Sequence, residues 1–367
     1  LSAVSSNIQS LKRRFWLLRR KMYSGIRSVS LILIILTVCM VVYTANRSRE
    51  AGEQRVAPNH KALLLTGIFD PPKADDGLTD LAKVASLQQQ QGVHFDLISV
   101  YLPWGDQPQN FVPVAMMDSI YRNHSTPMIT WEPWQNLFRG SSGQKDEHML
   151  ANITAGRYDD YIIRVAGQLR ALNRPVFLRF AHEADNPFYP WSAAGGNTPE
   201  DFKAAWRYLH ELFITHGAWN VIWVWNPWKP ETAAAYFPGK AYVDWIGVTG
   251  LNYGRYNTAG RSFSFKQLYT PFHQLALNRQ GIPVMIAEMG AVKDGQAQPA
   301  WLQAAVSSIR ADFHEVKAIV LFNSAFDKNV PDQQAAMINW QQDSLGTMAA
   351  FTVKHHLPVA PAAAANR

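Results

Sequence analysis

The chain has 367 residues, 47% of them apolar and 12% aromatic, which fits one large folded domain with an extension better than two ordinary domains. Its formal net charge is +7, but seven basic residues and no acidic residue lie within residues 1–28, so the rest carries 28 basic and 28 acidic side chains. This balance does not support a nucleic-acid-binding surface on the folded part, and we predict no nucleic-acid partner.

The first predicted element is a membrane anchor. The basic residues 1–28 precede an uncharged run over residues 29–45, which is near the lower limit of about 17 to 25 residues for a spanning helix. A cleaved signal peptide is the alternative, although the run is longer than usual for one. The positive-inside rule places the N-terminus in the cytoplasm, so the remainder faces the periplasm or exterior of a bacterial inner membrane. Residues 46–59 are polar and read as a linker.

The predicted folded domain covers residues 60–357, and the Ala- and Pro-rich residues 358–367 read as a disordered tail. Short β-rich runs alternate with helical patterns, which predicts a (β/α)8 TIM barrel, with a doubly wound sheet as the alternative. The runs cover residues 62–69, 95–101, 127–131, 176–182, 221–225, 245–250, 283–288 and 318–322. The clearest helical patterns cover residues 78–90, 156–172, 199–216, 265–278, 299–313 and 333–351, and the connections after the second and fifth runs are shorter.

Two glutamates close predicted strands, Glu183 at the fourth and Glu288 at the seventh. In a parallel barrel, side chains at the carboxyl ends of the strands surround one open end, called the mouth below. Retaining glycoside hydrolysis needs two carboxyl groups about 5 Å apart, one protonated to act as acid and one ionised to act as nucleophile. The pair therefore predicts a sugar-cleaving site, although either glutamate alone has a salt bridge or a loop contact as its simpler interpretation.

His182 directly precedes Glu183, and both side chains reach the mouth only if the strand bends or ends there. Its simpler interpretation is a hydrogen-bonded histidine at the rim of the core. The second histidine of a zinc-binding HExxH helix is absent, and the only cysteine is Cys39 in the predicted anchor. We therefore predict no metal site, disulfide or cofactor.

Tryptophans follow several predicted strands, and flat indole rings suit the apolar faces of sugars. Each of them alone is more commonly a core residue. We predict that three of them bind substrate: Trp131, Trp191 and Trp228.

The chain resembles glycoside hydrolase family 26, which includes β-mannanases and lichenases of the retaining clan A. The resemblance runs from about Lys61 to Phe351 and rests on five segments: Arg-Phe-Ala-His-Glu at 179–183, residues 221–227, 236–247 and 283–290, and Ile-Asn-Trp-Gln at 338–341. It implies a TIM barrel, with Glu183 as acid/base, Glu288 as nucleophile and His182 as an orienting neighbour. Asn226, Asn252 and Tyr253 are further predicted substrate-binding residues.

Three departures from the family pattern limit what it implies. Residues 184–189 replace the Met-Asn-Gly sequence that follows His-Glu in mannan-cleaving members, so mannan specificity is not implied. Leu251 stands at the position of a family tyrosine, and either Tyr253 replaces that tyrosine or the contact is missing. Leu321 or Phe322 stands in place of a tryptophan on the eighth strand.

These observations predict a membrane-anchored retaining endo-β-glycosidase that hydrolyses, or transfers, a β-linked polysaccharide such as a β-glucan or exopolysaccharide. The anchor suggests a polysaccharide synthase complex as a partner. The alternative is a catalytically weak glycan-binding or scaffold subunit of a polysaccharide synthesis and export complex.

Overall fold

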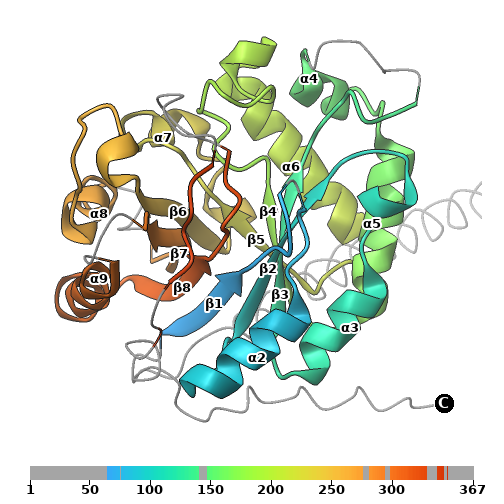
Figure 1. The fold of residues 1–367 in the computed structure, drawn as a ribbon. Coiled ribbons are helices and arrows are strands. Elements are labelled where there is room, and N and C mark those ends of the chain that lie inside the picture. The colour runs from blue at the N-terminus through green and yellow to red at the C-terminus, as the bar shows by residue number, and fades with distance from the viewer. Residues whose placement is uncertain are drawn as a thin grey trace, which may run out of the picture. The chain divides into compact units, whose positions relative to one another are not determined.

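The structure is a computed structural model that describes residues 64–74, 76–139, 147–275, 281–293, 298–328, 337–342 and 345. In these residues eight parallel strands form a closed barrel in chain order, with the last strand paired to the first (Figure 1). The strands are β1 (Leu65–Phe69), β2 (Leu97–Pro103), β3 (Thr126–Glu132), β4 (Val176–Phe180), β5 (Val221–Trp225), β6 (Trp245–Asn252), β7 (Val284–Ala291) and β8 (Val316–Phe322). The predicted barrel is confirmed, and the doubly wound sheet is excluded.

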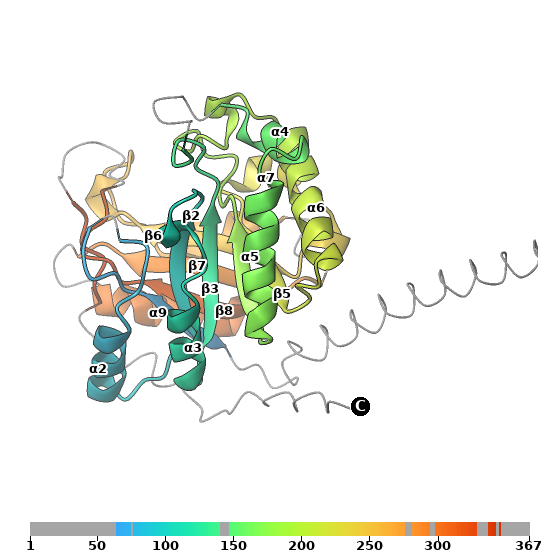
Figure 2. The same ribbon diagram turned by 90° about the vertical axis from the view of Figure 1, so that its right-hand side faces the viewer.

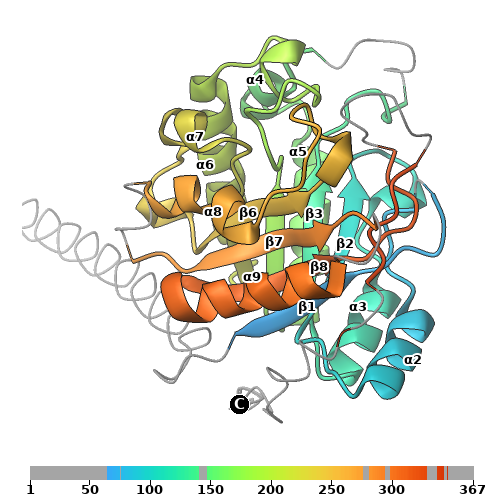
Figure 3. The same cartoon turned by 60° about the vertical axis from the view of Figure 1, so that its left-hand side comes forward.

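Helices cover the outside of the barrel. α5 and α6 lie outside the β3–β5 side, whereas α9 lies along β7 and β8 (Figures 2 and 3). The helices of the described residues are α2 (Leu81–Gln91), α3 (Val114–Arg122), α4 (Met149–Thr154), α5 (Asp159–Leu172), α6 (Pro199–Thr215), α7 (Pro230–Tyr236), α8 (Phe265–His273) and α9 (Gln298–Asp312).

Helix α6 shows how the sequence defines one of these elements. The Thr198 hydroxyl accepts a hydrogen bond from the Asp201 amide at 3.1 Å, and the Asp201 carboxylate accepts one from the Thr198 amide at 2.9 Å. This capping box satisfies amides of the first turn, and Pro199 has the φ angle that the first helical position requires. The face toward the barrel is buried through Phe202, Ala205, Trp206, Leu209 and Phe213.

Alternation along the strands separates the core from the interior of the barrel. On β3, Trp131 packs against Tyr161 of α5 and Phe213 of α6, whereas its neighbour Thr130 accepts a hydrogen bond from Arg179 of β4 inside the barrel. On β5, Trp225 packs against Phe237 on the outside. Successive strand residues face opposite sides of a sheet, so Trp131 and Trp225 lie in the layer between the barrel and the helices.

Several predicted bounds differ from the structure by a few residues, and two further differences are larger or bear on the site. The fourth strand ends at Phe180 rather than at residue 182. The predicted helix over residues 333–351 is wrong where it is described, because residues 337–342 are not helical and Ile338 forms an antiparallel bridge with Asp327.

The predicted anchor, linker and tail at residues 29–45, 46–59 and 358–367 lie outside the described residues. None of the helices that the structure describes is both long and apolar enough to cross a membrane.

Candidate active site

The segment after β4 brings two consecutive side chains to the mouth. Ala181 and Glu183 have positive φ angles of 41° and 52°, a conformation that costs non-glycine residues of order 1–3 kcal/mol each. The Glu183 amide donates to the carbonyl of Asn226 at 2.7 Å, which ties this turn to the end of β5. The alternation of the strand is thereby interrupted. His182 lies edge-on to Tyr101, and the Glu183 carboxyl reaches Thr249 on β6.

Glu183 is held in a buried, polar position. Its Oε1 accepts a hydrogen bond from the Thr249 hydroxyl at 2.5 Å, and its Oε2 accepts one from the Asn186 amide nitrogen at 2.8 Å. The pKa of Glu183 is raised to about 7, chiefly by burial and then by the nearby Glu288 charge, which together outweigh the lowering effect of the two hydrogen bonds and of Arg179. A carboxyl group with this pKa is substantially protonated near neutral pH.

Glu288 is held in an ion pair. Its Oε1 lies 2.8 Å from a guanidinium nitrogen of Arg179 and accepts the Tyr101 hydroxyl at 2.7 Å. Arg179 is fully buried and also donates to Thr130, Asn226 and Tyr101 at 2.9, 3.1 and 3.0 Å. The other oxygen of Glu288, Oε2, receives no hydrogen bond from a described residue. One oxygen is thus fixed and the other is open.

Thr249 connects the two glutamates. Its backbone is the register partner of Glu288 across the β6–β7 pair, where strands lie about 4.8 Å apart, and its hydroxyl donates to Glu183. A register shift between Val248 and Thr249 accompanies this arrangement. Glu288 lies inside β7, which extends to Ala291, rather than at a strand end as predicted. The structure nevertheless brings the predicted pair together.

His182 does not contact the Glu183 carboxyl through any hydrogen bond in the described residues. Its Nε2 lies 3.0 Å from the Tyr189 hydroxyl, and its buried Nδ1 has no partner among the described residues. Burial, reinforced by the Arg179 charge, lowers the pKa of His182 well below its ordinary value. A neutral imidazole therefore forms part of the wall of the mouth.

Trp131 and Trp191 are corrections to the predicted sugar-binding set. The Trp131 side chain is fully buried and donates to the Tyr161 hydroxyl at 3.2 Å, because its place on β3 faces the helices. Trp191 is also fully buried, stacked on Tyr189 at 4.5 Å with its indole donating to the His182 carbonyl. Trp191 supports residues of the wall without presenting a face to a sugar.

Trp228 is partly exposed and keeps its predicted role as a hypothesis. The loop that carries it is tied to the segment after Glu183 by Asp185. The Asp185 carboxylate accepts hydrogen bonds from the amides of Trp228 and Lys229 and from the Thr232 hydroxyl, at 2.7, 3.0 and 2.5 Å. The β4 and β5 loops are therefore joined at the rim.

Asn226 and Tyr253 lie where substrate contacts were predicted, and their roles stay predictions. Asn226 accepts a hydrogen bond from Arg179 inside the barrel. Tyr253 packs edge-on against Trp340 at 4.9 Å, and the charges of both glutamates contribute to raising its pKa, which places it close to them. Phe322 contacts the same Trp340, so a tryptophan from residues after β8 lies beside this strand end.

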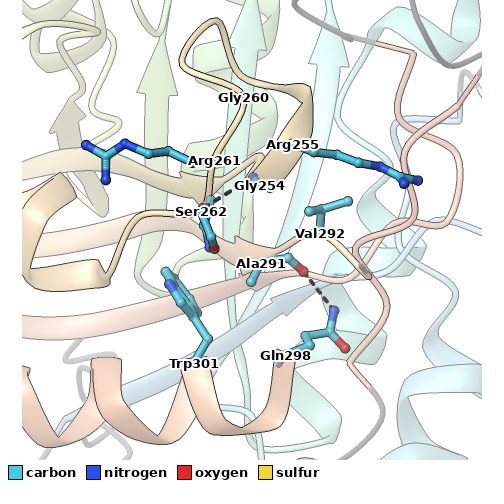
Figure 4. Close-up of a pocket in the computed structure, with 10 residues that line it drawn as sticks. Gly254, Arg255, Gly260, Arg261, Ser262, Ala291, Val292, Gln298 and Trp301 are labelled. Carbon is cyan, nitrogen blue, oxygen red and sulfur yellow. Dashed lines mark hydrogen bonds between the residues drawn. The ribbon is translucent and has the colours of Figure 1, made fainter. Parts of the chain in front are cut away.

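Asn252 is directed away from the two glutamates. Its amide donates to Ser262 at 2.7 Å and its carbonyl oxygen accepts from the Phe263 amide, which folds the loop after β6. It lines a pocket of about 210 Å³ beside Gln298 and Trp301, and Figure 4 shows Arg255 and Arg261 extending away from that pocket on opposite sides. Neither Glu183 nor Glu288 lines this pocket.

The sequence interpretation missed four polar residues of the mouth, namely Tyr101, Glu132, Arg179 and Thr249. Two of them had a visible signal. Arg179 is a cation inside an apolar strand, and Glu132 closes a buried run just as the two predicted glutamates do. Tyr101 and Thr249 had none, because their roles depend on register across neighbouring strands.

The arrangement provides a carboxyl group that is protonated near neutral pH and a carboxylate paired with arginine. These are the two groups that double displacement at an anomeric carbon requires. The described residues contain no cluster of three or more metal-ligating side chains.

Comparison with known proteins gives sequence and structural relatives. The chain is 32% identical over 249 residues to "Endoglucanase H" of Acetivibrio thermocellus, covering 65% of this chain and 26% of that protein. It is 28% identical over 174 residues to "Beta-1,3-xylanase TXYA" of Vibrio sp, covering 41% of this chain and 35% of that protein. The chain thus spans about a quarter to a third of these relatives' length. A GH26 β-mannanase structure from Bacteroides ovatus shares the fold, with a TM-score of 0.58, 14% identity, and coverage of 80% of this chain and 87% of that one.

The sequence profile of "Glycosyl hydrolase family 26" matches residues 123–321, more than half of the chain. This match includes both Glu183 and Glu288. The chain belongs to glycosyl hydrolase family 26.

Proposed function

We propose that the protein is a membrane-anchored retaining endo-β-glycosidase that cleaves a β-linked polysaccharide by double displacement. The observation that carries this proposal is the Thr249 connection, because it holds a protonatable Glu183 and an arginine-paired Glu288 across one mouth. Family membership supports the same reaction class.

Glu288 acts as the nucleophile. Arg179 and Tyr101 fix its Oε1, which leaves Oε2 to attack the anomeric carbon. The bond from Oε2 to the anomeric carbon forms as the glycosidic carbon–oxygen bond breaks. The positive charge of Arg179 stabilises the carboxylate both before this step and when it leaves in the second step.

Glu183 acts as acid and then as base. Its proton passes to the departing glycosidic oxygen, which releases one part of the polymer as an alcohol. The resulting carboxylate then takes a proton from water as the water oxygen attacks the anomeric carbon and displaces Glu288. If a sugar hydroxyl enters in place of water, the product is a transferred chain.

A β-glucan or an exopolysaccharide is the proposed substrate. The sequence relatives include "Endoglucanase H" and a β-1,3-xylanase, and also "Mannan endo-1,4-beta-mannosidase B" of Piromyces sp. The segment after Glu183 lacks the Met-Asn-Gly sequence of mannan-cleaving members, which favours a substrate other than mannan. Phe188 in that segment is 79% exposed, and Trp228 is partly exposed on the adjoining loop. Two aromatic side chains at the rim suit an extended polymer chain.

The uncharged run at residues 29–45 supports the anchoring part of the proposal. An anchored enzyme stays beside the membrane, where a synthase complex releases new polysaccharide. Membrane fractionation tests this part with antibody against the full chain. Recovery only as a shortened, freely secreted protein would overturn it.

The activity test measures reducing ends released by the full chain in mild detergent from mixed-linkage β-glucan, β-1,3-glucan, cellulose, mannan and β-1,3-xylan. We expect release from one polymer, loss of release in Glu288→Gln, and no loss in Glu200→Gln, a matched control on the exposed start of α6. The first product should keep the β configuration by NMR. If the protein binds a polymer but releases reducing ends from none of the five, the result would favour the alternative function, a glycan-binding or scaffold subunit of an export complex.

A further inference from the structure

A third carboxyl group lies at the mouth. Glu132 is the last residue of β3 and is two positions after Thr130, whose hydroxyl accepts a hydrogen bond from Arg179 inside the barrel. Residues two apart on a strand face the same side, so the Glu132 side chain is directed inward. Figure 2 shows β2 and β3 side by side, running toward the same end of the barrel.

Only half of this carboxyl group has a partner. Its Oε2 accepts the indole N–H of Trp134 at 3.2 Å, while Oε1 receives no hydrogen bond from a described residue. Trp134 in turn lies edge-on to Trp191 at 5.1 Å, so the bond fixes a partly exposed indole in the same wall. Glu132 therefore presents an open acceptor beside an aromatic ring.

Charge interactions indicate that Glu132 lies close to Arg179 and Glu288 at the mouth. Burial raises the pKa of Glu132 to about 7, with Arg179 lowering it and Glu288 raising it. The charge of Glu132 likewise contributes to raising the pKa values of Tyr101 and Tyr189. The group interacts with residues on β2, β4 and β7 and with the segment after β4.

The double displacement leaves Glu132 without a role. Glu132 is half-buried, and its Oε1 has no donor among the described residues, so water or the hydroxyl group of a ligand must satisfy that oxygen. Sugar hydroxyls are neutral donors and arrive together with an apolar ring face, which is the combination that Glu132 and Trp134 offer.

We propose that Glu132 is a substrate-binding residue whose Oε1 accepts a hydrogen bond from a hydroxyl group of the polysaccharide, with the Trp134 ring beside that sugar. This inference rests on the proposed glycosidase function. It assigns the β3 end of the mouth to recognition of the sugar and leaves the bond-breaking steps to Glu183 and Glu288.

The test compares Glu132→Gln with Trp134→Phe in the full chain, on oligosaccharides of the polymer that the wild type cleaves. Glutamine keeps an oxygen for the Trp134 indole but offers the sugar an amide donor in place of a carboxylate acceptor. Phenylalanine removes the indole bond and keeps both the carboxyl group and a ring. We expect Glu132→Gln to raise KM about tenfold or more with kcat within about threefold, and Trp134→Phe to change KM less.

Three results would overturn the assignment. Unchanged kinetics in Glu132→Gln would show that no sugar hydroxyl uses the carboxylate. Equal effects of the two variants would show that Glu132 only holds Trp134, and a fall in kcat at constant KM would place Glu132 in the chemical steps. These outcomes require an active wild type, whereas a wild type inactive on every polymer overturns the glycosidase proposal and this inference with it.

Discussion

Replacement of Arg179 by methionine is the strongest test of how the site is held together. The side chain is fully buried and donates to four groups, the Glu288 carboxylate, Tyr101, Thr130 and Asn226. Methionine fills a similar length with no charge and no donor. The variant leaves Glu288, whose side chain is only 11% exposed, without its cation.

The cost follows from that unpaired carboxylate. Removing one partner of a buried ion pair destabilises a protein by about 3–5 kcal/mol. At roughly 2–4 °C per kcal/mol for a domain of this size, Tm should fall by roughly 6–20 °C. Activity should fall as well, because Oε1 of Glu288 loses the donor that orients the carboxylate for attack.

The assay is thermal and urea unfolding of three forms beside the wild type. Arg179→Lys keeps a charge but not the planar fork and should lose less stability than Arg179→Met. The double variant Arg179→Met/Glu288→Leu should recover much of the loss, because an apolar pair replaces an unpaired charge, although it has no nucleophile. A single Arg179→Met variant as stable as the wild type, or a double variant no more stable than the single one, would refute the reasoning.

Three further changes test other parts of the structure. The pKa of Glu183 is raised to about 7 from 4.5, so the folded protein retains a proton that the unfolded chain releases, and wild-type stability falls as pH rises between those values. Glu183→Gln mimics the protonated form and should exceed the wild type by up to about 3 kcal/mol at pH 8 but not at pH 4 in urea unfolding; equal stability at pH 8 would contradict the raised pKa. Trp131→Ala should lower the free energy of unfolding by about 3–5 kcal/mol and change KM little, because the ring lies in the core. A raised KM at unchanged stability would show instead that the ring contacts the substrate. Asp185→Ala should lower the free energy of unfolding by about 1 kcal/mol, because the amides of Trp228 and Lys229 lose their acceptor. The same variant should raise KM as Trp228→Ala does. A KM effect confined to Trp228→Ala would show that the loop keeps its position without Asp185.

The fold was predictable because each strand is a short apolar run followed by a helical pattern. All eight predicted runs overlap observed strands, since burial on both faces leaves a continuous hydrophobic signal. The predicted helix over residues 333–351 failed where it is described. Its described part, residues 337–342, is held by the bridge to Asp327 and by the bond from the Trp340 indole to the same aspartate. Such a long-range contact has no local periodicity.

The positions of the two glutamates were predictable, but the way they are brought together was not. The position of the Glu183 side chain depends on positive φ angles at Ala181 and Glu183, which are not glycines. The alignment of Glu288 with Thr249 depends on a register shift between β6 and β7. Neither feature has a composition signal, because both are set by the packing of neighbouring strands. The partners Tyr101 and Thr249 were missed for the same reason.

Strand alternation explains why a tryptophan at the end of a strand was wrongly predicted to bind sugar. On β3 and β5, Trp131 and Trp225 face the helices, so the polar residue next to each, Glu132 and Asn226, faces the barrel interior. A strand end that pairs a tryptophan with a polar neighbour therefore places the large ring in the core and the small polar group at the mouth. On these two strands the position of the tryptophan indicates which neighbouring side chain faces the mouth, and the partly or fully exposed rings lie on the loops, at Trp134, Phe188 and Trp228.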